Sequence, residues 1–179
     1  AVDLDIRAGE VHIVAGENGA GKSTLMKVLA GSVRAESGTI ELDGEAVRID
    51  SPIAALKLGI VAVYQEFALC PDLTVAENVF LGQEPGRFFI DKKSMRARTA
   101  KLLQRLNARC SPDDLVRDLG TAQKQLVEIA RALKGSSRVL ILDEPTATLS
   151  ENEIRELFAV IRSLRQNGQA IAYISHRLE

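Results

Sequence analysis

Apolar positions group into short runs that predict strands. Alternation over Val2–Arg7 and the run Val11–Ala15 indicate two strands separated by a turn. Ile60–Tyr64 is continuously apolar, which is typical of a strand buried on both faces of a parallel or mixed sheet. Strand signal returns at Val139–Leu142 and again at residues 170–174. These runs predict a layered α/β fold around a mostly parallel central sheet.

Helix and turn signals fall between these strands. The segment up to Leu29 has helical character, a second helix is expected to begin near Ser51-Pro52, and a third to run from about Glu151 to Gln166 before Asn167-Gly168. Two short alternating runs flank Asp43-Gly44, which is a strong hairpin signal. The hairpin predicts a small antiparallel β subdomain beside the main sheet.

Helical spacing replaces strand signal from about residue 74 to residue 134. We therefore predict a core formed by residues 1–66 and 137–179, with a helical subdomain inserted at residues 67–136. The chain opens directly in a strand pattern, lacks an initial methionine and ends soon after its last strand. We expect it to be part of a longer protein, truncated at both ends of the core.

Composition and charge narrow the classes of partner. The chain has 179 residues with 23 basic and 24 acidic side chains, so its net charge of −1 argues against a polyanion partner such as nucleic acid. No run approaches the roughly 18 apolar residues of a membrane span. Cys70 and Cys110 lie far apart with no metal-ligand spacing, which favours packing roles in a reducing compartment.

A glycine-rich motif follows the run Val11–Ala15. Residues 16–23 match G-x-x-x-x-G-K-[ST] between a predicted strand and a predicted helix, where backbone N–H groups and the helix N-terminus favour phosphate. Lys22 would reach the outer phosphates and the Ser23 hydroxyl would bind Mg²⁺. A glycine turn that binds nothing is the alternative, and the strand and helix around the motif argue against it. The residues predicted to bind a nucleotide triphosphate are Gly16, Glu17, Asn18, Gly19, Ala20, Gly21, Lys22, Ser23 and Thr24.

Two carboxylates follow the apolar run Val139–Leu142. Asp143 and Glu144 occupy the carboxyl end of this strand, where open α/β sheets bind ligands. Asp143 is expected on the Mg²⁺ side, and Glu144 is expected to orient and polarise the water that attacks the outer phosphate. The pair could also cap a turn, but the phosphate-binding motif makes a catalytic role the better interpretation.

Together with Gln65, the segment Leu119–Gln125 and His176, these motifs occur in the order found in ATP-binding cassette (ABC) ATPases, which are P-loop NTPases. The resemblance covers nearly the whole chain. Five segments resemble the first ATPase half of bacterial monosaccharide importers: the phosphate loop and residues 63–66, 73–82, 127–133 and 173–177.

The resemblance implies roles that spacing alone does not give. Gln65 would sense Mg²⁺ and water while contacting a membrane subunit, and His176 would contact the outer phosphate as a switch. Glu144, His176, Gln65 and Lys22 would then form the catalytic set, and Ser23, Gln65 and Asp143 the metal set. The signature segment, Leu119–Gln125, would complete the site of a second, opposite domain through Leu119, Gly120, Thr121, Ala122, Gln123 and Gln125.

The sequence departs from the family pattern in the signature segment. Gly120 stands where serine is usual and Ala122 where the second glycine is usual, so a hydroxyl donor to the partner's phosphate is missing. After Glu144, the loop ending at Ser150 lacks the usual aspartate. The residue that stacks on adenine would lie upstream of Ala1. These departures leave the strength of turnover and of coupling between two sites open.

The function implied by the resemblance is Mg²⁺-dependent ATP hydrolysis that powers monosaccharide import. Expected partners are a second ABC ATPase domain in the same longer chain, membrane permease subunits and, indirectly, an external sugar-binding protein. The expected location is the cytoplasmic face of the bacterial plasma membrane. Two alternatives remain: an ABC ATPase that clamps nucleic acid or the ribosome, and an ATP-binding regulatory half with weak turnover. The sugar itself is not encoded in these residues.

Overall fold

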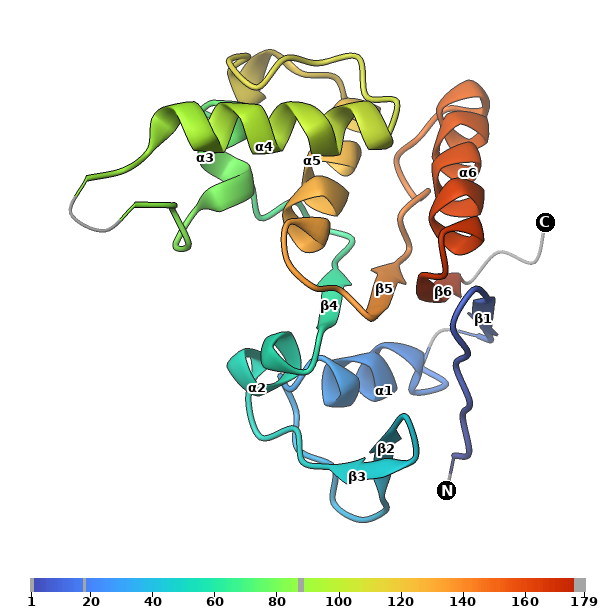
Figure 1. Ribbon diagram of the computed structural model, residues 1–179. Helices are drawn as coiled ribbons and strands as arrows, with labels where there is room; N and C mark the ends of the chain where they lie inside the picture. The colour runs from blue at the N-terminus through green and yellow to red at the C-terminus, as the bar shows by residue number, and fades with distance from the viewer. Residues whose placement is uncertain (1, 18, 87–88, 176–179) are drawn as a thin grey trace.

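The computed structural model describes residues 2–17, 19–86 and 89–175, with a four-stranded parallel sheet at the centre (Figure 1). The strand order is β1-β6-β5-β4, and every neighbouring pair runs parallel. The predicted α/β fold with a mostly parallel central sheet is thus confirmed. The strands are β1 (Val11–Ala15), β4 (Ile60–Val63), β5 (Val139–Asp143) and β6 (Ala170–Ser175).

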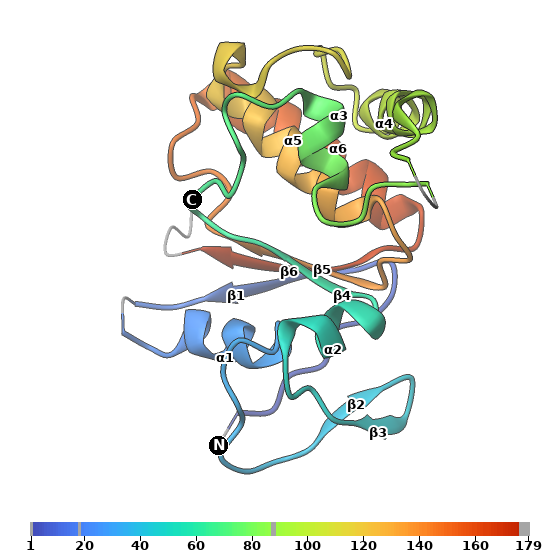
Figure 2. The same cartoon turned by 90° about the vertical axis from the view of Figure 1, so that its left-hand side faces the viewer.

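Helices cover both faces of the sheet (Figure 2). Two helices cover one face, and the larger helical layer covers the other, with α5 packed on β4 and α6. The first layer is α1 (Lys22–Leu29) and α2 (Pro52–Lys57); the second is α3 (Val75–Phe80), α4 (Lys92–Arg105), the 3₁₀ turn η1 (Val116–Asp118), α5 (Thr121–Leu133) and α6 (Glu151–Gln166). Among the described residues, no helix is both long and apolar enough to cross a membrane.

Alternate side chains of the central strands enter two different cores. In β5, Leu140 and Leu142 pack with the α3–α6 layer, whereas Ile141 packs with α1 and α2. Successive side chains of a strand point to opposite faces, so a strand between two helical layers must be apolar at every position. This explains why residues 60–63 and 139–142 are continuously apolar in the sequence.

The predicted hairpin is present as a two-stranded antiparallel sheet of β2 (Ile40–Leu42) and β3 (Glu45–Val47). Its turn residues Asp43 and Gly44 have φ angles of 55° and 80°. Positive φ at both central residues defines the hairpin turn that Asp-Gly favours. Local turn chemistry therefore fixed this element.

The predicted strand at Val2–Arg7 is wrong. This segment forms no ladder with any described strand, although Leu4 and Ile6 pack beneath the sheet against the α1 side of the core. The apolar alternation is real, but a strand also needs a neighbour whose backbone groups pair with its own. Among the described residues that neighbour is absent, so the alternation produces packing without a ladder.

Helices α3 and α6 begin with reciprocal caps. Thr74 and Glu77 form a capping box at α3, in which Glu77 accepts from the Thr74 N–H at 3.0 Å and Thr74 Oγ1 accepts from the Glu77 N–H at 3.2 Å. Ser150 and Glu153 do the same at α6, whose bounds agree with the prediction. These caps satisfy N–H groups that the first helical turn leaves unpaired.

We expect the α3 cap to make stability depend on pH. Hydrogen bonds from Thr74 lower the pKa of Glu77 below its ordinary value. A lowered pKa means that ionised Glu77 stabilises the fold above its unfolded pKa of about 4.3, and that this contribution is lost as pH falls further. Glu77→Gln should cost roughly 0.5–1 kcal/mol at pH 7 in urea unfolding, and the difference from wild type should shrink as pH falls from about 4.3 through the lowered pKa of Glu77. A gap that is constant with pH would contradict the assignment.

Asn78 holds the segment before α3 in place. The fully buried side chain accepts from the Cys70 N–H at 2.7 Å and donates to the carbonyls of Cys70 and Thr74, both at 3.0 Å. A third carbonyl, that of Leu73, lies 3.3 Å from Nδ2. One amide side chain therefore bonds the Cys70 N–H and adds a second donor to carbonyls that also accept from backbone N–H groups.

Asn78→Leu is expected to lower the free energy of unfolding by about 2 kcal/mol, because it leaves the half-buried N–H of Cys70 without its partner and removes one donor from the carbonyls of Cys70 and Thr74. Asn167→Ala is the matched control. The Asn167 side chain is exposed and donates only to Ser163 at 2.9 Å, so this change should cost less than about 1 kcal/mol. Equal losses in the two variants would show that Asn78 has no special structural role.

Candidate functional site

The phosphate-binding motif joins β1 to α1 in a turn that requires glycine. Gly19 and Gly21 have φ angles of 87° and 89°, and Gly21 is the N-cap of α1. Residues with a Cβ seldom adopt this backbone conformation, so glycine is needed at both positions. Asn18, predicted as part of this loop, lies outside the described residues. The turn leads directly into the helix N-terminus, as an anion site of this kind requires.

Lys22 lies folded over its own loop. Its Nζ donates to the carbonyl of Gly16 at 2.6 Å and to that of Glu17 at 2.9 Å. The positive charge is therefore held at the concave side of the turn by two backbone acceptors. Exchange of these acceptors for phosphate oxygens would need only a change of side-chain conformation.

The carboxylate pair lies at the same edge of the sheet as the loop. Asp143 is the last residue of β5 and pairs with Ile174, while Ala15 at the end of β1 pairs with Ser175. Parallel strands end at one edge, and β6 lies between the two elements. Glu144 follows with φ 47°, a left-handed conformation that turns the chain sharply after the strand.

Burial makes the charge on Asp143 costly. Desolvation, and next the neighbouring Glu144 carboxylate, raise the pKa of Asp143, whereas Lys27 and Lys22 oppose the shift. Two carboxylates in a half-buried position favour a nearby cation. The two lysines are near enough to act on Asp143, which ties β5 electrostatically to α1.

The donor set at this edge fits Mg²⁺ bound together with a phosphate. Ser23 is exposed in the first turn of α1 and offers a hydroxyl oxygen. Asp143 offers a carboxylate, and a bound cation would lower the raised pKa of this group again. Mg²⁺ is usually held by one or two protein oxygens with substrate phosphates and water. The described residues contain no cluster of three or more His, Cys, Asp or Glu side chains that could hold a metal ion.

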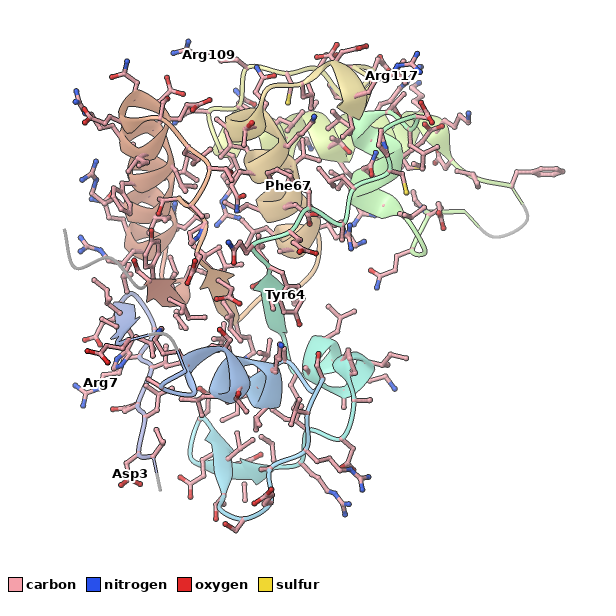
Figure 3. All side chains as sticks on the ribbon, turned by 180° about the vertical axis from the view of Figure 1, so that it is seen from behind. Asp3, Arg7, Tyr64, Phe67, Arg109 and Arg117 are labelled. Atoms are coloured by element: carbon pink, nitrogen blue, oxygen red, sulfur yellow. The ribbon has the colours of Figure 1, made fainter. Side chains whose placement is uncertain are left out.

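Gln65 lies just beyond β4, in the exposed stretch Tyr64–Ala68 that has no helix or strand. Figure 3 shows Tyr64 and Phe67 on this stretch as it passes from β4 towards α5. Because β4 is parallel to the other three strands, Gln65 emerges at the edge that carries the loop and the carboxylates. His176, predicted as the switch residue, lies outside the described residues; β6 ends at Ser175 immediately before it.

The signature segment is not brought to the loop in the same way. Thr121 begins α5, with Gly120 as N-cap, and α5 lies on the face of the sheet opposite to α1 (Figure 2). Gly120 is exposed, while Gln125 is only 4% exposed and faces the interior. Leu119, another of the predicted signature residues, is also buried, at 8% exposed.

The sequence analysis missed Asn78, Glu128 and Arg131. Each forms hydrogen bonds to the backbone between residues 68 and 74. Glu128 was detectable as a lone acidic residue inside the apolar run of α5, between Val127 and Ile129. Asn78 carried no comparable signal, because its partners are main-chain groups.

Comparison with known proteins places these motifs in one family. The family model described as "ABC transporter" matches residues 1–147. The chain is 56% identical over 179 residues to the protein named ribose import ATP-binding protein RbsA 3 of Rubrobacter xylanophilus, covering 99% of the chain and 36% of the relative. It is 53% identical to ribose import ATP-binding protein RbsA 1 of Streptomyces avermitilis, covering 99% of the chain and 34% of that protein. The chain thus spans about a third of these relatives.

Solved structures agree with the fold. A nucleotide-free ATP-binding cassette of an ABC transporter superposes with a TM-score of 0.86 at 28% identity, over 98% of this chain and 74% of that one. An ABC transporter cassette in its ADP conformation gives a TM-score of 0.87 at 27% identity, over 99% and 74%. The resemblance inferred from the motifs is confirmed by sequence and by structure, and the chain belongs to the ABC transporter family.

Proposed function

We propose that this chain is an ATPase unit that powers import of a monosaccharide, with the bound ATP at the carboxyl edge of the sheet. The observation that carries the proposal is the meeting there of the Lys22 loop, the Asp143-Glu144 pair and the start of the Gln65 stretch. Relatives named as ribose import ATP-binding proteins support the direction and the class of cargo.

In this proposal the loop binds the phosphates of ATP. Its backbone N–H groups and the N-terminus of α1 supply partial positive charge, and Lys22 moves from its loop carbonyls to the outer phosphates. Thr24 lies in the same first turn. Phosphoryl transfer requires mainly positioning and charge stabilisation from the protein, and the loop provides both.

Mg²⁺, when bound, would neutralise charge on the outer phosphates. Ser23, Asp143 and Gln65 are the residues we assign to hold it, directly or through water. Glu144 would accept a proton from the attacking water and fix its direction, and His176 would contact the transferred phosphate. The left-handed turn at Glu144 supports this role, because it separates the direction of its side chain from that of Asp143.

The second half of the mechanism involves another domain. We propose that residues 67–136 form a helical subdomain whose signature segment, in which Gly120 is exposed and residues 121–123 are half-buried, completes the site of an opposite ABC domain. Residues 1–66 and 137–179 form the core in this proposal. The N-terminus of α5 would direct its N–H groups at that domain's ATP. Movement would pass through the Gln65 stretch to a permease on the cytoplasmic face of the bacterial plasma membrane, supplied by a sugar-binding protein.

The test uses the full-length protein assembled with its permease in vesicles. ATP hydrolysis should require Mg²⁺ and, because both ABC domains are expected in one longer chain, should be proportional to the amount of assembled transporter. Uptake of labelled pentoses and hexoses should depend on ATP. Hydrolysis without uptake of any sugar would contradict the import assignment, and hydrolysis stimulated by nucleic acid or ribosomes would favour a non-transport function.

Gly120→Ser tests the altered signature. Gly120 has φ −68° and ψ 164°, and a Cβ there would meet nothing within 4 Å, so serine fits without strain. We expect turnover to change by about two- to tenfold, because the hydroxyl adds one donor to the opposite phosphate, in line with a single hydrogen bond of about 0.5–1.5 kcal/mol. ATP affinity at this chain's own loop should stay the same. Unchanged turnover would remove any special role for position 120.

A further inference from the structure

Two charged side chains of α5 hold one residue of the stretch that follows Gln65. The N–H of Ala68 donates to Oε1 of Glu128 at 2.7 Å, and Nη1 of Arg131 donates to the carbonyl of Ala68 at 2.7 Å. Glu128 and Arg131 are one turn apart on α5, with 3.8 Å between their charged atoms. Both backbone polar groups of Ala68 are thus bonded by a single ion pair.

Burial shows that this contact is more than a surface ion pair. The Glu128 side chain is 10% exposed and that of Arg131 is 32% exposed. Withdrawing a carboxylate from water is unfavourable unless it is paired and hydrogen-bonded, and here Arg131 and the Ala68 N–H do both. Ala68 itself is exposed, so water could have satisfied its backbone. The main effect of the contact is therefore to fix the position of Ala68, because its N–H and carbonyl could have bonded to water instead.

The position of Ala68 limits where Gln65 can lie. The stretch is fixed at one end by Val63, the last residue of β4, and at the other by the contact at Ala68. Ala68 is three residues after Gln65, so the two are separated by at most about 10 Å of chain. Figure 3 shows this short connection passing Tyr64 and Phe67 between β4 and α5. The chain between the α5 contact and Gln65 is therefore too short to allow large independent movement.

The same helix carries the signature segment at its other end. Helix α5 is continuous from Thr121 to Leu133, and Gly120 caps its N-terminus. A helix moves as a rod over this length, so displacement of the signature end also displaces Glu128 and Arg131. A displacement of the signature segment by a binding partner is thereby transmitted to the Gln65 stretch through the hydrogen bonds to Ala68.

We propose that Glu128 and Arg131 are positioning residues that couple the signature helix to Gln65. The proposal rests on the proposed function, in which the signature segment meets one ATP and Gln65 contacts another site and the permease. Glu128 and Arg131 touch no reacting group. They set where Gln65 stands when α5 moves.

The first test measures amide hydrogen exchange in the full-length protein without nucleotide. Glu128→Ala should raise the exchange rate of the Ala68 amide at least tenfold, whereas Glu128→Gln, which keeps an oxygen acceptor, should retain most of the protection. Asp72→Ala is the matched control, because it removes an exposed ion pair to Arg117 at 2.9 Å without touching Ala68. Unchanged exchange in Glu128→Ala, with an unchanged melting temperature, would overturn the proposal.

The second test measures sugar transported per ATP hydrolysed in vesicles. Glu128→Ala and Arg131→Ala should each lower this ratio several-fold with ATP affinity unchanged. The ratio of the double variant should be no lower than that of the single variant with the lower ratio. Glu128→Gln should restore part of the ratio, and Asp72→Ala should leave it intact. An equal ratio in all variants would overturn the coupling role. A wild-type protein that hydrolyses no ATP would instead contradict the proposed function, and amide exchange would still decide whether the two side chains hold Ala68.

Discussion

Glu144→Gln is expected to lower the ATP hydrolysis rate of the full-length protein by roughly 10²- to 10⁴-fold, the usual contribution of a positioned general base. The substitution keeps the size of the side chain but removes its ability to accept a proton. It also removes one of the two causes that raise the pKa of Asp143, namely the neighbouring charge. ATP affinity should therefore be unchanged or higher, which separates loss of chemistry from loss of binding.

Single-turnover hydrolysis and equilibrium binding of labelled ATP would measure the two effects of Glu144→Gln separately. Glu45→Gln is the control, because Glu45 is exposed on β3 of the hairpin and is remote from the proposed chemistry. It should match wild type in both measurements. Retention of more than about a tenth of the rate by Glu144→Gln would fall below the range expected for a general base and would assign that role to another residue.

Lys22→Ala is expected to weaken ATP binding by roughly ten- to a hundredfold, because a hydrogen bond to a charged group contributes about 1.5–3 kcal/mol. The effect should appear in the dissociation constant and in hydrolysis alike. Lys22 now bonds two loop carbonyls, at 2.6 and 2.9 Å, so its removal also frees the loop. Lys22→Arg should not restore affinity fully, because a planar fork replaces a compact point charge.

Isothermal titration calorimetry with ATP and Mg²⁺ would provide the dissociation constants of the Lys22 variants for ATP. Lys57→Ala on α2 is the matched control, since it removes one exposed lysine from the same face of the sheet. Wild-type affinity in Lys22→Ala would contradict the assignment of the loop as the phosphate site, whatever its effect on rate.

Local chemistry explains what the sequence predicted well. Asp43-Gly44 favours a tight hairpin between short strands, and Asn167-Gly168 marks the end of α6. The phosphate loop and Asp143-Glu144 are also contiguous motifs, so a role for them can be predicted from neighbouring residues alone, and that role stays a prediction. Each of these features depends on a few successive side chains and backbone angles.

Features that depend on distant partners were not predictable from such patterns. Val2–Arg7 has a strand's alternation, but the ladder requires a neighbour elsewhere in the chain. The order β1-β6-β5-β4 follows from packing of two helical layers that no single run of residues encodes. Glu128 is explained only by the Ala68 backbone, 60 residues away in sequence. The partners of Asn78 are nearer in sequence, but they are main-chain groups that no side-chain pattern marks.

The parallel sheet also sets a delay during synthesis. Val11 at the start of β1 pairs with Ile171 in β6, so β1 has no ladder partner among the described strands until β6 has been made. At about 5–20 residues per second, the ribosome needs on the order of ten seconds to make the chain between them. During that interval the phosphate loop follows a strand that has not yet formed its ladder with β6. Substitutions in β6 that slow this late pairing would therefore reduce the yield of nucleotide-competent protein in the cell, while molecules that finish folding could still bind ATP normally.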